Sequence, residues 1–259
     1  MRNALQLAAA TLLLIAATTA RAQVYTQPQS APPTPPEPRA DSRSKHDKHP
    51  QHTDVEWLWQ YSPPPADGRE NALIQDPHFL PFLDDTLTAP QSFWGVQGTK
   101  YKPLADTAYD FLSVPGKVIA DDNRYLSITG CVFHFCPDRG MLWVDLNGAK
   151  KSASTEHLVV FAATDWIRES KASTEPGAEY TLWLFANQAF GLTPDAPNRI
   201  PPALIHSLTR WTKEPLAGSG IVENITHAIV VDPDGTPHQV PLATLGVTAP
   251  KTTAEGGGN

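Results

Sequence analysis

The two cysteines of the chain, Cys131 and Cys136, lie five residues apart between two strand-like runs. These runs, Arg124–Gly130 and Met141–Leu146, are rich in apolar and β-branched residues, which is typical of strands. The segment between them is short and contains a proline and a glycine, residues that favour turns. The sequence therefore predicts two neighbouring antiparallel strands joined by a tight loop that contains both cysteines.

The amino terminus predicts export from the cytoplasm. A short positive segment with Arg2 precedes an apolar run from residue 4 to 17, and Ala20-Arg21-Ala22 has the small-x-small pattern of a cleavage site. The apolar run is shorter than the roughly 20 residues of a membrane-spanning helix, and no later segment suggests a span. We interpret residues 1–22 as a signal peptide and expect a periplasmic or secreted protein.

The charge of the chain bears on its partners. Without residues 1–22 the chain has 18 basic and 27 acidic residues, and the part from residue 53 onward has a net charge of −10. Nucleic-acid binding selects basic surfaces, so we do not expect a nucleic-acid partner. An acidic surface suits a basic protein partner because complementary charge speeds encounter, although it also simply keeps a protein in solution.

Composition divides the rest of the chain into three parts. Residues 23–52 are rich in proline, serine, glutamine and histidine and have too little apolar surface to fold, so we expect an extended linker. Residues 53–246 contain the periodic segments and form the expected domain, which ends in a hairpin. The small and polar residues 247–259 are predicted to be a disordered tail.

Periodicity within the domain predicts an α+β fold: an antiparallel β-sheet with short flanking helices and a disulfide-closed loop between two adjacent strands. The nearly all-apolar run 158–163 is the expected central strand. The other expected elements are strands at 56–61, 117–120, 180–185, 226–231 and 236–245, and short helices within 71–87, 104–111 and 201–211.

The loop between the cysteines admits several interpretations. In an oxidising compartment two nearby cysteines usually form a disulfide, which would present His134 between Phe133 and Phe135 on a rigid loop. The bridge could instead be a structural crosslink with an uninvolved histidine. Metal binding by Cys131, His134 and Cys136 is a third reading, although a structural zinc site needs four ligands.

This region resembles the signature of the Ivy family, inhibitors of vertebrate (c-type) lysozyme. The resemblance covers residues 104–161 and includes the run Tyr125-Leu126-Ser127-Ile128-Thr129-Gly130-Cys131, followed by Val132-Phe133-His134-Phe135-Cys136, a polar turn and an apolar strand. The spacing of the two cysteines and the histidine matches the Cys-Lys-Pro-His-x-Cys loop of the family. Val132 and Phe133 replace the Lys-Pro pair, and Phe135 stands where the family commonly has a polar or acidic residue.

The resemblance implies a function and its residues. The loop Cys131, Val132, Phe133, His134, Phe135 and Cys136 would enter the catalytic cleft of a lysozyme, where His134 would hydrogen-bond the catalytic carboxylates. The implied partner is a c-type lysozyme or a periplasmic lytic transglycosylase. An imidazole can donate from both nitrogens, and lysozyme works with two carboxylates, so the chemistry is consistent.

The main alternative is an envelope-binding or scaffold domain that keeps this fold without inhibiting an enzyme. We do not expect the chain itself to be an enzyme, because no set of catalytic residues stands out. The acidic pairs Asp84-Asp85 and Asp121-Asp122 occur in turn-like sequence, where adjacent carboxylates point apart. No cofactor and no bound metal are predicted, and the oligomeric state is left open.

Overall fold

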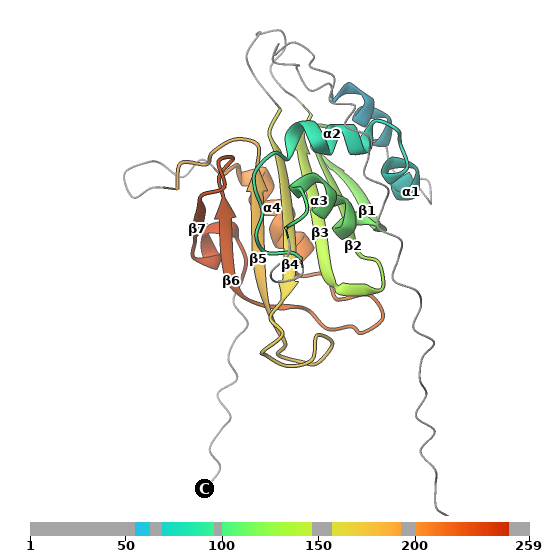
Figure 1. The fold of residues 1–259 in the computed structure, drawn as a ribbon. Coiled ribbons are helices and arrows are strands. Elements are labelled where there is room, and N and C mark those ends of the chain that lie inside the picture. Colours follow the sequence, from blue (N-terminus) through green and yellow to red (C-terminus); the bar gives the residue numbers. More distant parts are fainter. Residues whose placement is uncertain (1–54, 63–68, 96–99, 147–156, 193–199, 249–259) are drawn as a thin grey trace, which may run out of the picture. The chain divides into compact units, whose positions relative to one another are not determined.

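A seven-stranded sheet, with its strands in chain order, forms the centre of the fold (Figure 1). This computed structural model describes residues 55–62, 69–95, 100–146, 157–192 and 200–248, which belong to one unit of residues 51–259. The strands are β1 (Val114–Asp121), β2 (Tyr125–Val132), β3 (Phe135–Asp145), β4 (Val159–Trp166), β5 (Glu179–Ala186), β6 (Asn224–Val231) and β7 (Pro237–Gln239). The apolar run predicted to be central is β4, which has three strands on either side.

Every neighbouring pair of strands is antiparallel except β5 and β6, which are parallel. The helix α4 (Pro202–Thr212) lies between these two strands in the chain, and a parallel pair needs such a crossover. The predicted α+β class, with its sheet of mostly antiparallel strands, is therefore confirmed. The expectation of a purely antiparallel sheet is wrong for this one pair.

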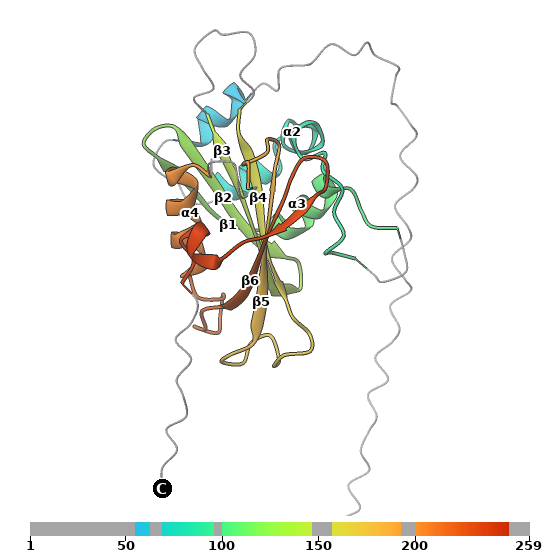
Figure 2. The same cartoon turned by 90° about the vertical axis from the view of Figure 1, so that its left-hand side faces the viewer.

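Helices cover both faces of the sheet, so the fold has three layers (Figure 2). The helices α2 (Phe79–Thr86) and α3 (Leu104–Leu112) pack on one face, over a core that includes Phe111 and Phe161. Helix α4 packs on the other face, over a core that includes Trp143 and Trp211. The alternating side chains of each strand supply both cores, which is why the central strands β3 and β4 are apolar on both sides.

Two glycines bring α3 unusually close to the sheet. Gly130 of β2 and Gly140 of β3 face each other across the ladder. A Cβ atom added at Gly130 would lie 2.7 Å from the Leu112 Cα atom, and one at Gly140 would lie 2.8 Å from the Phe111 Cβ atom. Only residues without a side chain fit here, so this pair sets the position of the carboxyl end of α3.

Two sequence predictions of local structure are wrong. The segment predicted to be a strand at 56–61 is the 3₁₀-helix η1 (Glu56–Tyr61). Its buried residues, together with the preceding one, are Val55, Leu58 and Tyr61, a spacing of three that matches the 3₁₀ repeat.

The second arm of the carboxyl-terminal hairpin is also shorter than predicted. Strand β7 pairs with β6 at the edge of the sheet over three residues only. Pro241 then precedes the 3₁₀-helix η2 (Leu242–Leu245), because proline cannot donate a ladder hydrogen bond. Val247 is buried against the α4 side, so the packed chain extends one residue past the boundary predicted at 246.

The signal peptide (1–22), the linker (23–52) and residues 249–259 of the predicted tail lie outside the described residues, and these interpretations stay predictions. The first α-helix of the described part, α1 (Arg69–Ile74), is one of the two short helices predicted within 71–87. Asp84 and Asp85 lie in α2 rather than in a turn. In the described ranges no helix is both long enough and apolar enough to cross a membrane.

Candidate functional site: the cysteine loop

The predicted disulfide is present in the cysteine loop, residues 131–136, and it joins two adjacent antiparallel strands. Cys131 and Cys136 are bonded, with their Cα atoms 4.8 Å apart. The ladder partner of Cys131 is Arg139, however, and the next pair is Val132 with Phe135. Cys136 and the two residues after it therefore form a bulge in β3. The bridge ties the strands together at the point where the ladder is interrupted.

The turn is two residues long and consists of Phe133 and His134. Both side chains are exposed, and Phe133 exposes 64% of its surface, the largest value among the large apolar residues of the described chain. His134 has a φ of 65°, a left-handed conformation that is uncommon for residues other than glycine, asparagine, aspartate and histidine. The two rings lie 3.8 Å apart between centroids, so the tip presents an imidazole beside an aromatic ring.

Contacts beneath the tip hold the turn in place. The Phe133 backbone N–H donates to the Ser113 Oγ atom at 3.2 Å, and Ser113 is the residue that follows α3. Val132 packs against the core on the α3 side. Phe135 lies 5.9 Å from Trp166, between ring centroids. Of the six predicted loop residues, the structure thus exposes Phe133 and His134 and turns Val132 and Phe135 toward the protein.

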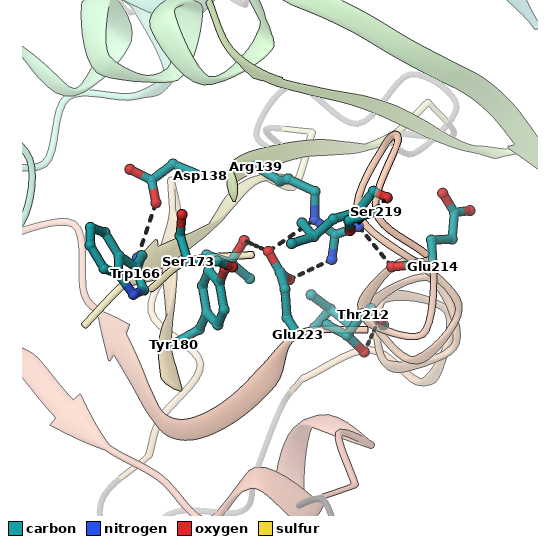
Figure 3. Close-up of polar contacts among 12 residues, drawn as sticks. Asp138, Arg139, Trp166, Ser173, Tyr180, Thr212, Glu214, Ser219 and Glu223 are labelled. Carbon is teal, nitrogen blue, oxygen red and sulfur yellow. Dashed lines mark hydrogen bonds and ion pairs between the residues drawn. The ribbon is translucent and has the colours of Figure 1, made fainter. Parts of the chain in front are cut away.

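A buried ion pair joins Glu223 to Arg139, the ladder partner of Cys131 (Figure 3). The Arg139 Nε atom donates to a Glu223 carboxylate oxygen at 3.1 Å, and a second guanidinium nitrogen contacts the other oxygen. The Thr164 hydroxyl also donates to Glu223, at 2.9 Å. The remaining Arg139 nitrogen donates to the Glu214 backbone carbonyl at 3.0 Å. This network links β3 and β4 to the segment between α4 and β6.

Asp138, in the bulge, is a further buried ionisable group that the sequence did not single out. Its side chain accepts the Trp166 backbone N–H at 3.0 Å, which replaces a ladder bond lost at the bulge. The pKa of Asp138 is raised to about 8, mainly by burial and in smaller part by the nearby carboxylates of Asp165 and Glu223. Burial also raises the pKa of Asp165, to about 6. The base of the loop is therefore rich in poorly solvated carboxyl groups.

The sequence interpretation of residues 137–140 as a polar turn is wrong, because they belong to β3. The segment is polar because Arg139 pairs with a buried carboxylate, and not because it is exposed to solvent. That partner, Glu223, is 84 residues away in the chain. The sequence did contain one signal: an aspartate and an arginine, Asp138 and Arg139, stand just before the apolar run Met141–Leu146. Charged residues are seldom fully buried without a partner, so this pattern indicates pairing but cannot identify the partner.

The metal reading of the loop does not fit the structure. Cys131 and Cys136 are bonded to each other, and a disulfide supplies no thiolate, the form of cysteine that binds metal. Across the described ranges, no group of three or more histidine, cysteine, aspartate or glutamate side chains is arranged to hold a metal ion.

Comparison with known proteins identifies no relative. No family model matches the sequence, and neither a curated protein nor a solved structure matches it.

Proposed function

We propose that this chain is an exported inhibitor of a muramidase, either a c-type lysozyme or a periplasmic lytic transglycosylase, and that the cysteine loop enters the catalytic cleft of the enzyme. The observation that carries the proposal is the loop tip. Its two residues, Phe133 and His134, are exposed, while the disulfide and the Ser113 contact fix the backbone beneath them. A preorganised loop loses less conformational entropy on binding.

The chemistry of the tip suits such a cleft. A muramidase of the lysozyme type has two carboxyl groups that flank the scissile bond. The His134 imidazole can donate a hydrogen bond from each ring nitrogen when protonated and could therefore engage both carboxyl groups. Phe133 would pack on the apolar surface where a sugar normally lies. In the family loop a Lys-Pro pair occupies the positions of Val132 and Phe133, so in this chain an apolar contact by Phe133 would replace the contacts of that pair.

The charge of the chain supports a basic enzyme as partner. The part of the sequence from residue 53 onward has a net charge of −10, and complementary charge raises association rates and disfavours acidic competitors. Resemblance to the Ivy family and the predicted signal peptide both agree with a partner found outside the cytoplasm.

The test is lysis of bacterial cell walls by c-type lysozyme, or by a transglycosylase, with and without the mature protein. His134→Gly keeps the left-handed backbone that the turn needs and removes the imidazole. It should weaken inhibition by about 10- to 100-fold, the equivalent of a lost hydrogen bond to a charged group. His206→Ala is the matched control, because His206 is an exposed histidine on α4, and it should inhibit like the wild type.

Cys131→Ser tests the role of the bridge in the same assay. It should weaken inhibition because the loop then samples more conformations before it binds. If the wild-type protein leaves both enzyme classes fully active at micromolar concentration, the inhibitor is excluded and the scaffold alternative is favoured.

A further inference from the structure

We propose that a pocket beside the cysteine loop, which we call the aromatic pocket, binds a saccharide that carries a carboxylate. The pocket has a volume of about 670 Å³ and is lined by Phe93, Trp94 and Trp166, by the basic residues Lys100 and Arg168, and by Asp165. It adjoins the loop because Trp166 contacts Phe135. The proposal goes beyond inhibition and does not depend on it.

The aromatic walls are fixed before any ligand arrives. Phe93 stacks on Trp183 with 5.2 Å between ring centroids, and Trp94 meets Phe111 edge to face at 4.8 Å. The Trp166 indole N–H donates to the Lys171 backbone carbonyl at 2.8 Å. Each of the three lining rings is nevertheless partly exposed. A ligand would therefore meet an ordered apolar surface and would lose little free energy to rearrangement of the protein.

The charge around the pocket is opposite in sign to that of the chain as a whole. Three of the residues that line the pocket are basic, namely Lys100, Lys102 and Arg168, while Asp165 and Glu169 are acidic. Lys102 is already paired with Asp110 at 2.6 Å. Lys100 and Arg168 are exposed and form no hydrogen bond or ion pair within the described part of the chain. Both side chains can therefore donate hydrogen bonds to a ligand carboxylate, and Arg168, whose charge also acts on Asp165 and Asp138, can bind one through two parallel hydrogen bonds.

Asp165 adds a polar group inside the pocket. It lies near the end of β4 and is partly buried, and its side chain makes no hydrogen bond to any described residue. The charge of Arg168 nevertheless acts on this carboxyl group and lowers its pKa, against the larger effect of burial. A partly buried carboxyl group without a hydrogen-bond donor is poorly solvated, and a ligand hydroxyl group would supply that donor. Its raised pKa, of about 6, has the same cause, because burial disfavours its charged form.

A carboxylated saccharide meets all three features. One face of a pyranose ring consists of C–H groups, which pack on the electron-rich face of an aromatic ring. Its hydroxyl groups can donate to Asp165, and its carboxylate can pair with Arg168 and Lys100. The volume lies within the usual range of small-molecule sites. A simple aromatic acid would use the walls and the cations but would leave the Asp165 carboxyl group without a hydrogen-bond donor.

The experiment is calorimetric titration of the mature protein alone with two matched probes. The acidic probe is the disaccharide of N-acetylglucosamine and N-acetylmuramic acid, and the neutral probe is N,N′-diacetylchitobiose, which lacks the carboxylate. The acidic probe should bind saturably. Arg168→Gln and Lys100→Gln should each weaken it by about tenfold, the lower end of the range for a hydrogen bond to a charged group, because both side chains are exposed. Lys213→Gln, an exposed lysine after α4, is the control and should not change binding.

The neutral probe should bind more weakly, and Arg168→Gln should not affect it. The proposal is overturned if neither probe binds at concentrations up to ~10 mM, or if Arg168→Gln and Lys213→Gln have the same effect. Tighter binding of benzoate than of the acidic disaccharide would also overturn it, in favour of an aromatic acid. Because no enzyme is present, these outcomes are independent of whether the loop inhibits a muramidase.

Discussion

The buried carboxyl group of Asp138 should make the stability of this protein depend on pH. The Asp138 side chain lies in the bulge of β3 and is 2% exposed. Burial raises its pKa to about 8 in the folded protein, while an aspartate in an unfolded chain has a pKa of about 3.9. Between these two values the folded state binds a proton that the unfolded state has released.

The sign of the effect follows from this difference. When the folded state holds more protons, the free energy of unfolding falls as the pH rises, by about 1.4 kcal/mol per pH unit for one proton. The contribution of Asp138 is therefore fully present below about pH 4, declines up to about pH 8, and is constant above that value. A shift of about four units corresponds to a loss of about 5 kcal/mol, a large share of the 5–15 kcal/mol typical of a domain.

Asp138→Asn isolates this contribution. The amide oxygen can still accept the Trp166 N–H, but the side chain has no proton to lose. At pH 9 the variant should be more stable than the wild type by up to about 5 kcal/mol, and the difference should shrink to near zero by about pH 4. Urea unfolding followed by tryptophan fluorescence at pH 5, 7 and 9, at constant ionic strength, measures it.

The control is Asp122→Asn, an exposed aspartate in the turn between β1 and β2, which should leave the pH dependence unchanged. If the free energy of unfolding varies with pH in the same way for Asp138→Asn and for the wild type, Asp138 is charged in the folded protein at neutral pH. The inference from its burial would then be wrong.

Two further substitutions test the packing behind the loop. Arg139→Met leaves the buried Glu223 carboxylate without its ion-pair partner and should lower the free energy of unfolding by about 3–5 kcal/mol. Urea unfolding at pH 7 measures this change, and a loss below about 1 kcal/mol would mean that the ion pair is solvated. Gly140→Ala places a Cβ atom against Phe111 and should cost about 1–3 kcal/mol in the same measurement, whereas an unchanged midpoint would show that α3 moves away freely.

Much of the sheet could be predicted because its signals are local. The apolar run around Val160 and Phe161 indicated a central strand, and it forms β4. The disulfide-linked strand pair followed from the spacing of Cys131 and Cys136 between two strand-like runs. In both cases neighbours in the chain are neighbours in space, so periodicity and turn residues suffice.

Sequence patterns gave wrong predictions where two hydrophobic periodicities overlapped, or where two paired strands are separated by a helix in the chain. Val55, Leu58 and Tyr61 recur every three residues, but the segment that contains them also alternates between apolar and polar residues, and such alternation predicts a strand. The parallel pairing of β5 with β6 depends on α4 crossing between them. A helix between two strand-like runs is the usual sign of such a crossover, so this feature was available in the sequence.

The base of the loop could not be predicted. Residues 137–140 looked like a turn because they are polar, whereas Arg139 is buried against a glutamate 84 residues away. The aromatic pocket likewise combines the segment around Trp94 with the end of β4. Contacts at such separations have no signature in a single sequence.

A double-mutant cycle tests directly the proposed contact between His134 and the catalytic carboxyl groups of a muramidase. Binding of wild-type and His134→Gly protein would be measured by calorimetry against c-type lysozyme and against a lysozyme variant whose catalytic glutamate is glutamine. We expect the two substitutions to be non-additive, with a coupling free energy of about 1.5–3 kcal/mol, the scale of a hydrogen bond to a charged group. Additive effects, or no binding of the wild-type pair, would contradict the proposed contact.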